Sequence, residues 1–280
     1  MIVRGVLETT SIDNHFAKKS LQESQFAITS LASQMQACWD ATIRTWLSHN
    51  LDQTDASRSM RWCVSSVHDL AAHQLRNWLT VNRPEDSFWR ITQADVPQRN
   101  QLENPKATGI DRLLAGWFAF ERLGLKTAGV IVVDAGSAVT IDWVDRQAVF
   151  QGGMIFPGLR LSANSLSLGT DALPEVQITD PQRIIHNVFG RSTVPAIESG
   201  LYWSQWGGIC HGVTRLQQVA SSNSQCPAAV VVTGGGMRMF EPLIPADWDH
   251  QPDLMVAAIL QLADQADKSS DESLSQPGTK

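Results

Sequence analysis

Apolar positions follow helical spacing in three stretches of the chain. Steps of three and four residues between them predict helices over residues 27–51 and 68–79. A third helix is predicted over residues 112–123, where Gly124 stands in the position that helices favour for a left-handed cap. Residues 1–30 show sparse apolar positions and no clear pattern.

Apolar runs of strand length predict a sheet in the second half of the chain. Residues 129–133 form a continuous apolar run, which is typical of a strand covered on both faces. Alternating apolar and polar residues predict a strand over residues 138–144, and a third strand follows residues 145–147 and ends at residues 152–153. Three strands joined by tight turns and followed by a helix form the opening of a ribonuclease-H-like domain.

The remaining segments complete a mixed α/β pattern. We expect a short strand at residues 62–64 and mostly loop over residues 91–108. Residues 197–219 predict one long helix and residues 228–233 another buried strand, which leads into a run of glycines. Residues 253–266 predict the closing helix.

Composition and charge exclude some classes of protein. Of the 280 residues, 43% are hydrophobic and 18% are charged, which indicates a globular chain rather than a disordered one. The formal net charge of −6 argues against non-specific nucleic-acid binding, because neutralising phosphates requires a basic face. We therefore expect no nucleic-acid partner.

Hydropathy and cysteine usage bear on the compartment. No apolar run reaches the roughly 20 residues that span a bilayer, and the N-terminus lacks the apolar core of a signal peptide. The four cysteines stand singly, which predicts buried thiols rather than disulfides or a zinc site. We expect a cytoplasmic protein with no membrane partner.

Six short motifs occur in order along the chain. They are Gly-Ile-Asp-Arg at 109–112, Asp-Ala-Gly-Ser-Ala-Val-Thr at 134–140, Gly-Gly-Met-Ile-Phe-Pro-Gly at 152–158, Gly-Thr-Asp-Ala-Leu-Pro at 169–174, Gly-Arg-Ser-Thr at 190–193 and Thr-Gly-Gly-Gly at 233–236. In order and spacing they resemble the type III pantothenate kinases, from about residue 60 to about residue 262. One such motif is a weak signal, whereas six in order are a strong one.

The resemblance implies an α/β protein built from two ribonuclease-H-like domains of the sugar-kinase/actin-like ATPase fold. We expect an N-terminal domain over residues 1–115, of which residues 1–30 are atypical. A C-terminal domain is expected over residues 116–266, followed by a disordered tail at residues 267–280.

The N-terminus departs from the family pattern, and the first domain lacks a recognisable phosphate-loop hairpin. The family begins with a strand, an Asp-x-Gly-Asn-Thr/Ser turn and a second strand. Here Asp13 and Asn14 have neither a preceding apolar strand nor the glycine that lets a phosphate approach the backbone. The acid that helps to hold Mg²⁺ is also missing. Either an upstream hairpin belongs to the protein, or this is a diverged relative that phosphorylates poorly or not at all.

The resemblance assigns catalysis and substrate binding to one segment. It makes Asp111 the general base for the primary hydroxyl of pantothenate, because phosphoryl transfer requires a group that takes the proton of the attacking alcohol. Gly109, Ile110, Asp111 and Arg112 then bind pantothenate, with Arg112 as a partner for its carboxylate. The alternative is that Asp111 simply caps the following helix. The family often has a tyrosine where Leu102 stands, so one substrate contact is in doubt.

The second group of candidate residues follows two buried strands. Asp134 lies at the carboxyl end of a strand, where open α/β sheets place ligands, and the resemblance assigns it to a monovalent cation, K⁺ or NH₄⁺. It assigns Ser137, beside Gly136, to ATP. An Asx turn at the strand end is the alternative reading of Asp134.

The last two motifs supply further contacts. Thr193 matches the family's second pantothenate-binding position, and the alternative is an N-cap of the following helix. Gly234 and Gly235 follow a buried strand as an adenosine-side loop does, although a glycine run alone is only a turn.

The resemblance implies an enzyme that phosphorylates pantothenate to 4′-phosphopantothenate, the first step of coenzyme A synthesis, using ATP with Mg²⁺. Two rivals stay open: a ligand-binding or regulatory relative without turnover, and a kinase for another small hydroxyl substrate such as a sugar or acetate. Family members are homodimers. The apolar surplus of residues 112–123 suits a dimer face and, nearly as well, core packing within one subunit.

Overall fold

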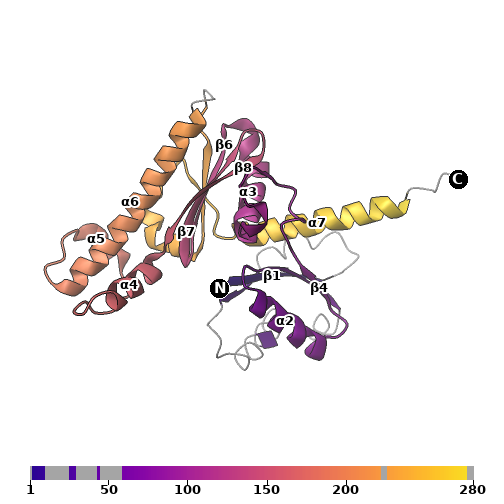
Figure 1. Ribbon diagram of the computed structural model, residues 1–280, viewed down its shortest axis with the longest axis horizontal. Helices are drawn as coiled ribbons and strands as arrows, with labels where there is room; N and C mark the ends of the chain where they lie inside the picture. The colour runs from indigo at the N-terminus through magenta and orange to yellow at the C-terminus, as the bar shows by residue number, and fades with distance from the viewer. Residues whose placement is uncertain (1, 10–24, 30–42, 45–58, 222–225, 276–280) are drawn as a thin grey trace. The chain divides into compact units, whose positions relative to one another are not determined.

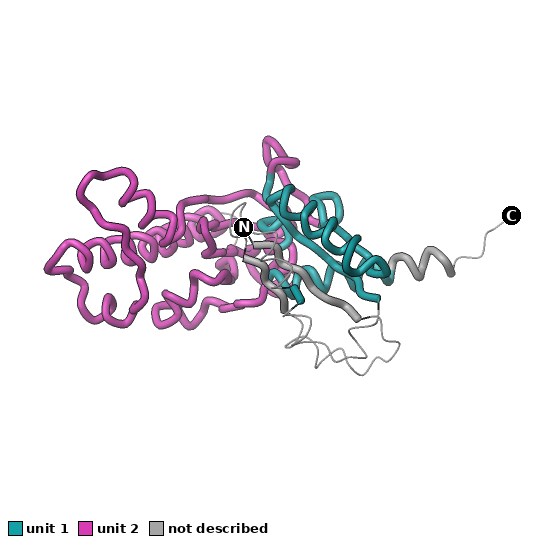
Figure 2. Tube along the Cα trace, turned by 90° about the horizontal axis from the view of Figure 1, so that it is seen from below, with its two compact units in different colours: residues 1–97, 108–114, 255–280 teal, residues 98–107, 115–254 magenta. Residues whose placement is uncertain are grey.

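The computed structural model describes most of the chain, in two compact units (Figure 2). The described residues are 2–9, 25–29, 43–44, 59–221 and 226–275. Unit 1 comprises residues 1–97, 108–114 and 255–280, and unit 2 comprises residues 98–107 and 115–254. The domain bounds expected from the sequence stay a prediction.

Unit 2 is built on a six-stranded sheet in the order β10-β9-β6-β7-β8-β5. Its strands are β5 (Arg99–Asn100), β6 (Gly129–Ala135), β7 (Ala138–Asp145), β8 (Val149–Pro157), β9 (Ala229–Thr233) and β10 (Asp249–His250). Strands β6, β7 and β8 form an antiparallel meander, while β9 pairs parallel with β6, and β10 with β9. The order from β10 to β8 is the ribonuclease-H-like arrangement that the sequence pattern predicts.

Helices cover this sheet and complete its core. The long helix α6 (Thr193–Ser221) runs along one face of the sheet (Figure 1), where Ile141, Tyr202 and Ile209 are fully buried in one apolar cluster. Residues 129–133 of β6 are all buried, which explains their continuous apolar run. The described part of unit 2 also contains η3 (Pro105–Ala107), most of α3 (Ile110–Leu123), η4 (Gly124–Lys126), α4 (Leu159–Leu168), α5 (Pro181–His186) and η5 (Gly235–Leu243).

Unit 1 contains a four-stranded sheet in the order β2-β1-β3-β4. The strands of this sheet are β1 (Ile2–Thr9), β2 (Gln25–Thr29), β3 (Met60–Ser65) and β4 (Ser87–Arg90), and helix α2 (Asp69–Asn82) connects β3 to β4. The strand predicted at residues 62–64 and the helix predicted at residues 68–79 are confirmed as β3 and α2. Strand β3 pairs antiparallel with β1 and parallel with β4.

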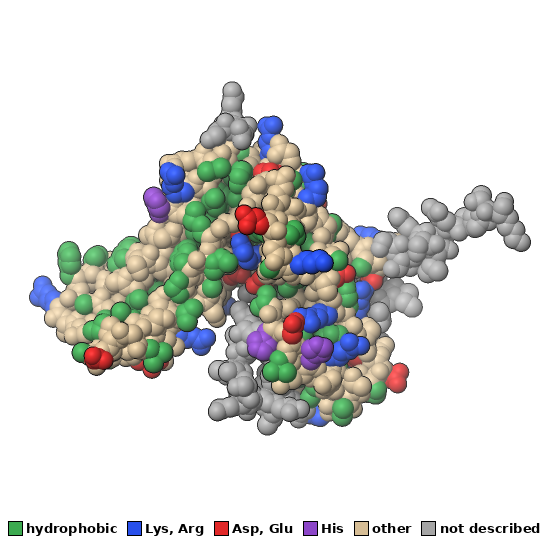
Figure 3. All heavy atoms as spheres, in the orientation of Figure 1, with side chains coloured by type: hydrophobic (Ala, Val, Ile, Leu, Met, Phe, Trp, Pro, Cys, Tyr) green, Lys and Arg blue, Asp and Glu red, His purple; other side chains and the backbone are tan. Residues whose placement is uncertain are grey.

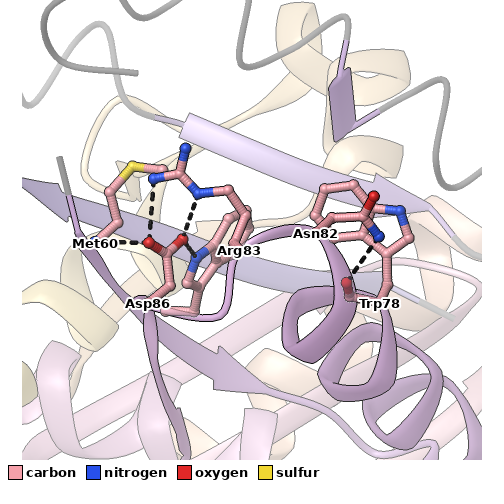
Figure 4. Close-up of polar contacts among 6 residues, drawn as sticks. Met60, Trp78, Asn82, Arg83 and Asp86 are labelled. Atoms are coloured by element: carbon pink, nitrogen blue, oxygen red, sulfur yellow. Dashed lines mark hydrogen bonds and ion pairs between the residues drawn. The ribbon is translucent and has the colours of Figure 1, made fainter. Parts of the chain in front are cut away.

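A buried carboxylate connects three segments of unit 1 (Figure 4). Asp86 Oδ1 accepts hydrogen bonds from the Met60 backbone N–H and the Arg83 guanidinium, and Oδ2 accepts from Trp62 Nε1 and Arg83 Nε. The Asp86 side chain is 2% exposed, so these donors replace the water that it loses on folding. The network joins the start of β3 to the turn between α2 and β4.

The first thirty residues contain secondary structure that we did not predict from the sequence. They form an antiparallel pair of strands, β1 and β2, where we found no element, and β2 occupies the start of the helix predicted over residues 27–51. Strand propensity depends on neighbouring strands, and β1 lies between β2 and the central strand β3. Residues 10–24, which include Asp13 and Asn14, and most of the predicted helix lie outside the described residues.

Two other expectations are wrong in detail. Gly124 has no positive φ and begins the short helix η4, so it is not a left-handed cap. A glycine is required there for space, because a Cβ would overlap the Phe120 ring. The closing helix α7 (Leu254–Ser275) continues through residues that we expected in a disordered tail.

Helix α3 (Ile110–Leu123) buries its apolar side chains within the single chain. Leu114, Trp117, Phe118 and Phe120 are each at most 5% exposed. Their surplus is therefore accounted for by core packing, which was the alternative to a dimer face. Hydrophobic side chains are exposed instead over the α4–α6 part of unit 2 (Figure 3), where Leu168 and Phe189 are both 88% exposed.

We predicted buried thiols and no membrane-spanning segment, and the structure bears on both predictions. Cys63 is buried, Cys210 is partly buried and Cys226 is exposed, so buried thiols are confirmed only in part; Cys38 lies outside the described residues. Burial raises the pKa of the Cys210 thiol, which lowers its reactivity. Among the helices of the described residues, none is long and apolar enough to cross a bilayer.

Candidate active site

The Asp111 carboxylate lies in the first turn of α3. The Gly109 carbonyl accepts the backbone N–H of Leu113, which makes Gly109 the cap position and Asp111 the second helical residue. Asp111 Oδ1 accepts the backbone N–H of Arg112 at 2.9 Å. Asp111 is therefore not the N-cap that we considered, and the positive end of the α3 dipole stabilises its negative charge.

Gly109 provides the space that this carboxylate occupies. A Cβ built on Gly109 would lie 2.5 Å from Asp111 Oδ1, well inside any real contact distance. The preceding residue, Thr108, is buried, and its carbonyl accepts a hydrogen bond from Gln93 Nε2. The segment that leads into Asp111 is thus held by unit 1, while Asp111 and Arg112 remain partly exposed.

In unit 2, a second carboxylate lies where two parallel strands end. Asp134 of β6 is paired with Thr233 of β9, so the residues that follow the two strands emerge at the same edge of the sheet. A Cβ on Gly234 would overlap Asp134 Oδ1 and lie 2.5 Å from the Ala135 carbonyl oxygen. Both oxygens therefore lie against the Gly234 backbone. Carboxylate and carbonyl oxygens are the kind of ligand that suits an alkali or other hard cation.

The turn after β6 is closed by backbone hydrogen bonds. The Gly136 N–H donates to the Ala138 carbonyl, and the Gly158 N–H donates to the Ser137 carbonyl, both at 2.9 Å. Ser137 itself is exposed, so its hydroxyl is accessible to a ligand. Gly158 closes the motif at 152–158, and its contact with Ser137 is visible only in the structure.

Thr193 is the first residue of α6 and is exposed. The Ala196 N–H donates to the Ser192 carbonyl, which places Ser192 rather than Thr193 at the cap position. The segment before α6 is held by Ser199, which donates from Oγ to the Val188 carbonyl, and by the ion pair between Arg183 and Glu198.

The structure thus brings together one set of the residues singled out in the sequence. Asp134, Gly136, Ser137, Gly234 and Gly235 lie at the adjoining ends of β6 and β9 in unit 2, or directly after them. Residues 109–112 belong to unit 1, and Thr193 lies elsewhere in unit 2, at the start of α6. The convergence of Asp111 and Asp134 on one cleft stays a prediction.

Comparison with known proteins identifies the family. The sequence profile described as type III pantothenate kinase matches residues 14–215, which is more than half of the chain. The chain belongs to this family. The profile match includes Asp111, Asp134, Ser137 and Thr193, while the Thr-Gly-Gly-Gly segment at 233–236 follows its end.

Individual type III pantothenate kinases agree with the profile. The protein of that name from Rhodopirellula baltica is 37% identical over 175 residues, covering 61% of this chain and 60% of the relative. The one from Sulfurihydrogenibium sp. is 31% identical over 188 residues, covering 67% and 69%. The chain therefore spans about two thirds or less of the length of these two relatives.

Solved structures also overlap with the chain at low identity. A Baf family protein from Campylobacter jejuni has a TM-score of 0.48 at 18% identity, covering 72% of this chain and 81% of that chain. A ParM filament from Clostridium botulinum has a TM-score of 0.39 at 8% identity, covering 94% and 85%.

Proposed function

We propose that the protein phosphorylates pantothenate to 4′-phosphopantothenate with ATP, the first step of coenzyme A synthesis. Membership of the type III pantothenate kinase family supports this reaction. The observation that carries it in this chain is the Asp111 carboxylate, held at the start of α3 beside a glycine that leaves room for it.

In this reaction Asp111 takes the proton of the primary hydroxyl as the hydroxyl oxygen attacks the γ-phosphorus. The new O–P bond forms while the bond from the γ-phosphorus to the bridging oxygen breaks, so ADP leaves with the electron pair. Residues 109–112 and Thr193 hold pantothenate, and Arg112 pairs with its carboxylate.

The loops of unit 2 would serve the nucleotide side. Ser137 and Gly136 contact ATP, and Gly234 and Gly235 form its adenosine side. Asp134 holds K⁺ or NH₄⁺, for which its carboxylate and the Ala135 carbonyl are fitting ligands. Mg²⁺ enters with ATP, bound mainly by phosphate oxygens and water.

We further propose a homodimer in the cytoplasm. The exposed apolar side chains over α4–α6, such as Leu168 and Phe189, support a contact with a second copy, because large apolar patches mark interaction surfaces. Sedimentation velocity measures this directly, and a monomer at micromolar concentration contradicts the dimer.

The reaction is tested with purified protein, ATP–Mg²⁺ and pantothenate, with and without KCl, by following ADP release and product mass. We expect one ADP per 4′-phosphopantothenate and faster turnover with K⁺. The same assay with a sugar and acetate panel is the control. Turnover confined to sugars or acetate contradicts the assignment to pantothenate.

A ligand-binding relative without turnover is the second candidate. One observation favours it: the segment around Asp13 and Asn14 contains no glycine, although a phosphate loop needs backbone freedom there. Calorimetry separates the two candidates, because this relative binds pantothenate while releasing no ADP above background.

A further inference from the structure

Three consecutive glycines follow β9, but their surroundings differ sharply. A Cβ on Gly235 would meet no atom within 4 Å, and one on Gly236 would lie 2.7 Å from the Ala135 carbonyl oxygen. On Gly234 the nearest atom to a Cβ would be Oδ1 of Asp134, and the two would overlap. Of the three positions, Gly234 is the one whose missing side chain leaves space for the carboxylate.

The backbone at Gly234 is also one that side chains disfavour. Its φ of 92° and ψ of 148° lie in a region that only glycine populates readily. Thr233, the residue before it, is fully buried and paired with Asp134 in the parallel ladder between β9 and β6. The pairing fixes Gly234 beside Asp134, and the unusual φ turns the chain away immediately after the strand.

We propose that Gly234 is a positioning residue for the Asp134 carboxylate. Asp134 Oδ1 and the Ala135 carbonyl oxygen both lie where a side chain on Gly234 would begin, so any side chain at position 234 displaces that carboxylate. The consequence for a bound cation rests on the proposed function, in which Asp134 holds K⁺ or NH₄⁺. Gly234 thereby acts on the cation side of the site, in addition to any contact with the nucleotide.

A double-mutant cycle tests the positioning without any substrate. The proteins are wild type, Gly234→Ala, Asp134→Ala and the double variant, and the readout is the thermal midpoint. If Gly234 is glycine because of the carboxylate, the fall in midpoint caused by Gly234→Ala is smaller by at least about 2 °C in the Asp134→Ala background than in wild type. A smaller difference overturns the proposal, since the glycine is then needed for the backbone alone.

The outcome remains decisive if Gly234→Ala does not fold. Folding of the double variant supports the proposal, because removing the carboxylate then relieves the clash. Failure of both variants to fold overturns it. Gly236→Ala provides the matched control, since its Cβ meets the Ala135 carbonyl but not the carboxylate, and its cycle with Asp134→Ala should show no coupling.

A second readout concerns the cation. Replacing choline chloride by KCl at equal ionic strength should raise the thermal midpoint of wild type and of Gly235→Ala, because an ion that binds only the folded state stabilises it. Gly234→Ala and Asp134→Asn should lose this rise, and a full rise in Gly234→Ala overturns the link to the cation. Absence of the rise in wild type instead contradicts the cation assignment of the proposed function, and the cycle still decides the positioning.

Discussion

Both candidate carboxylates share one feature at the scale of single residues. Asp111 lies against Gly109 and Asp134 lies against Gly234, and in each pair a Cβ on the glycine would collide with Oδ1. A carboxylate confined by backbone in this way has fewer positions to adopt, and positioning contributes strongly to phosphoryl transfer. Gly109 and Gly234 therefore leave room for the two carboxylates, in addition to any close approach of a phosphate.

Asp111→Asn tests the role of the base. The amide keeps the size of the side chain but cannot take a proton, so we expect turnover to fall by about 10²-fold or more with an unchanged thermal midpoint. Steady-state ADP release and differential scanning fluorimetry measure the two quantities. Glu121→Gln, an exposed acid on the same helix, is the matched control and should turn over normally. A near-native rate in Asp111→Asn excludes it as the base.

At the scale of elements, unit 1 depends on the Asp86 network. Asp86→Ala removes the acceptor of the Trp62 Nε1–H and the Met60 N–H, and it breaks the ion pair with the Arg83 guanidinium. We expect a loss of about 3 kcal/mol in the free energy of unfolding. Urea unfolding followed by tryptophan fluorescence measures it. Glu85→Ala, at the exposed neighbouring position, should change stability by less than about 0.5 kcal/mol.

Tyr202 connects α6 to η5, and its ionisation should lower the stability of the fold at alkaline pH. Its hydroxyl donates to the Met239 carbonyl at 2.9 Å, so Tyr202→Phe should cost about 1 kcal/mol at neutral pH. Burial raises the pKa of the Tyr202 phenol, so the folded state keeps the proton at a pH where the unfolded state releases it. The buried, neutral phenol therefore contributes its full share to the free energy of unfolding below the ordinary tyrosine pKa of about 10. This contribution is lost as pH rises above that value.

The pH dependence can be read from the difference between the two proteins. Urea midpoints of wild type and Tyr202→Phe, measured between pH 8 and 11, should converge as pH rises. Other titrating groups cancel in this comparison because both proteins contain them. A constant difference up to pH 11 indicates that the phenol ionises equally in both states, which contradicts the effect of burial.

At the scale of the whole molecule, α3 distinguishes core packing from assembly. Leu114 is fully buried, so Leu114→Ala should cost about 2–5 kcal/mol and leave the mass in solution unchanged. Urea unfolding and sedimentation velocity measure these quantities. Leu125→Ala, at a position 72% exposed just after the helix, should alter neither. Dissociation of an oligomer at unchanged protomer stability would instead make this helix an intersubunit contact.

Elements with a strong local apolar pattern form where the sequence predicts them. Strand β6 and helix α2 carry strong apolar patterns, and both form close to their predicted bounds. Strand β1 was missed because its pairing with β3 involves residues more than fifty positions away, which no local window contains. Helix α7 continues beyond residue 266, where its apolar repeat ends, and the polar residues that follow resemble a disordered tail in the sequence.

The sequence by itself determined the family, the alternation of buried strands and helices, and the candidate acids, because short motifs and apolar periodicity are local properties. It did not reveal that Asp134 and Gly234, a hundred residues apart, would lie in contact. The parallel pairing of β6 with β9 decided that, since the register between distant strands depends on how the whole sheet packs. Only the tertiary structure therefore shows why the residue beside this carboxylate has no side chain.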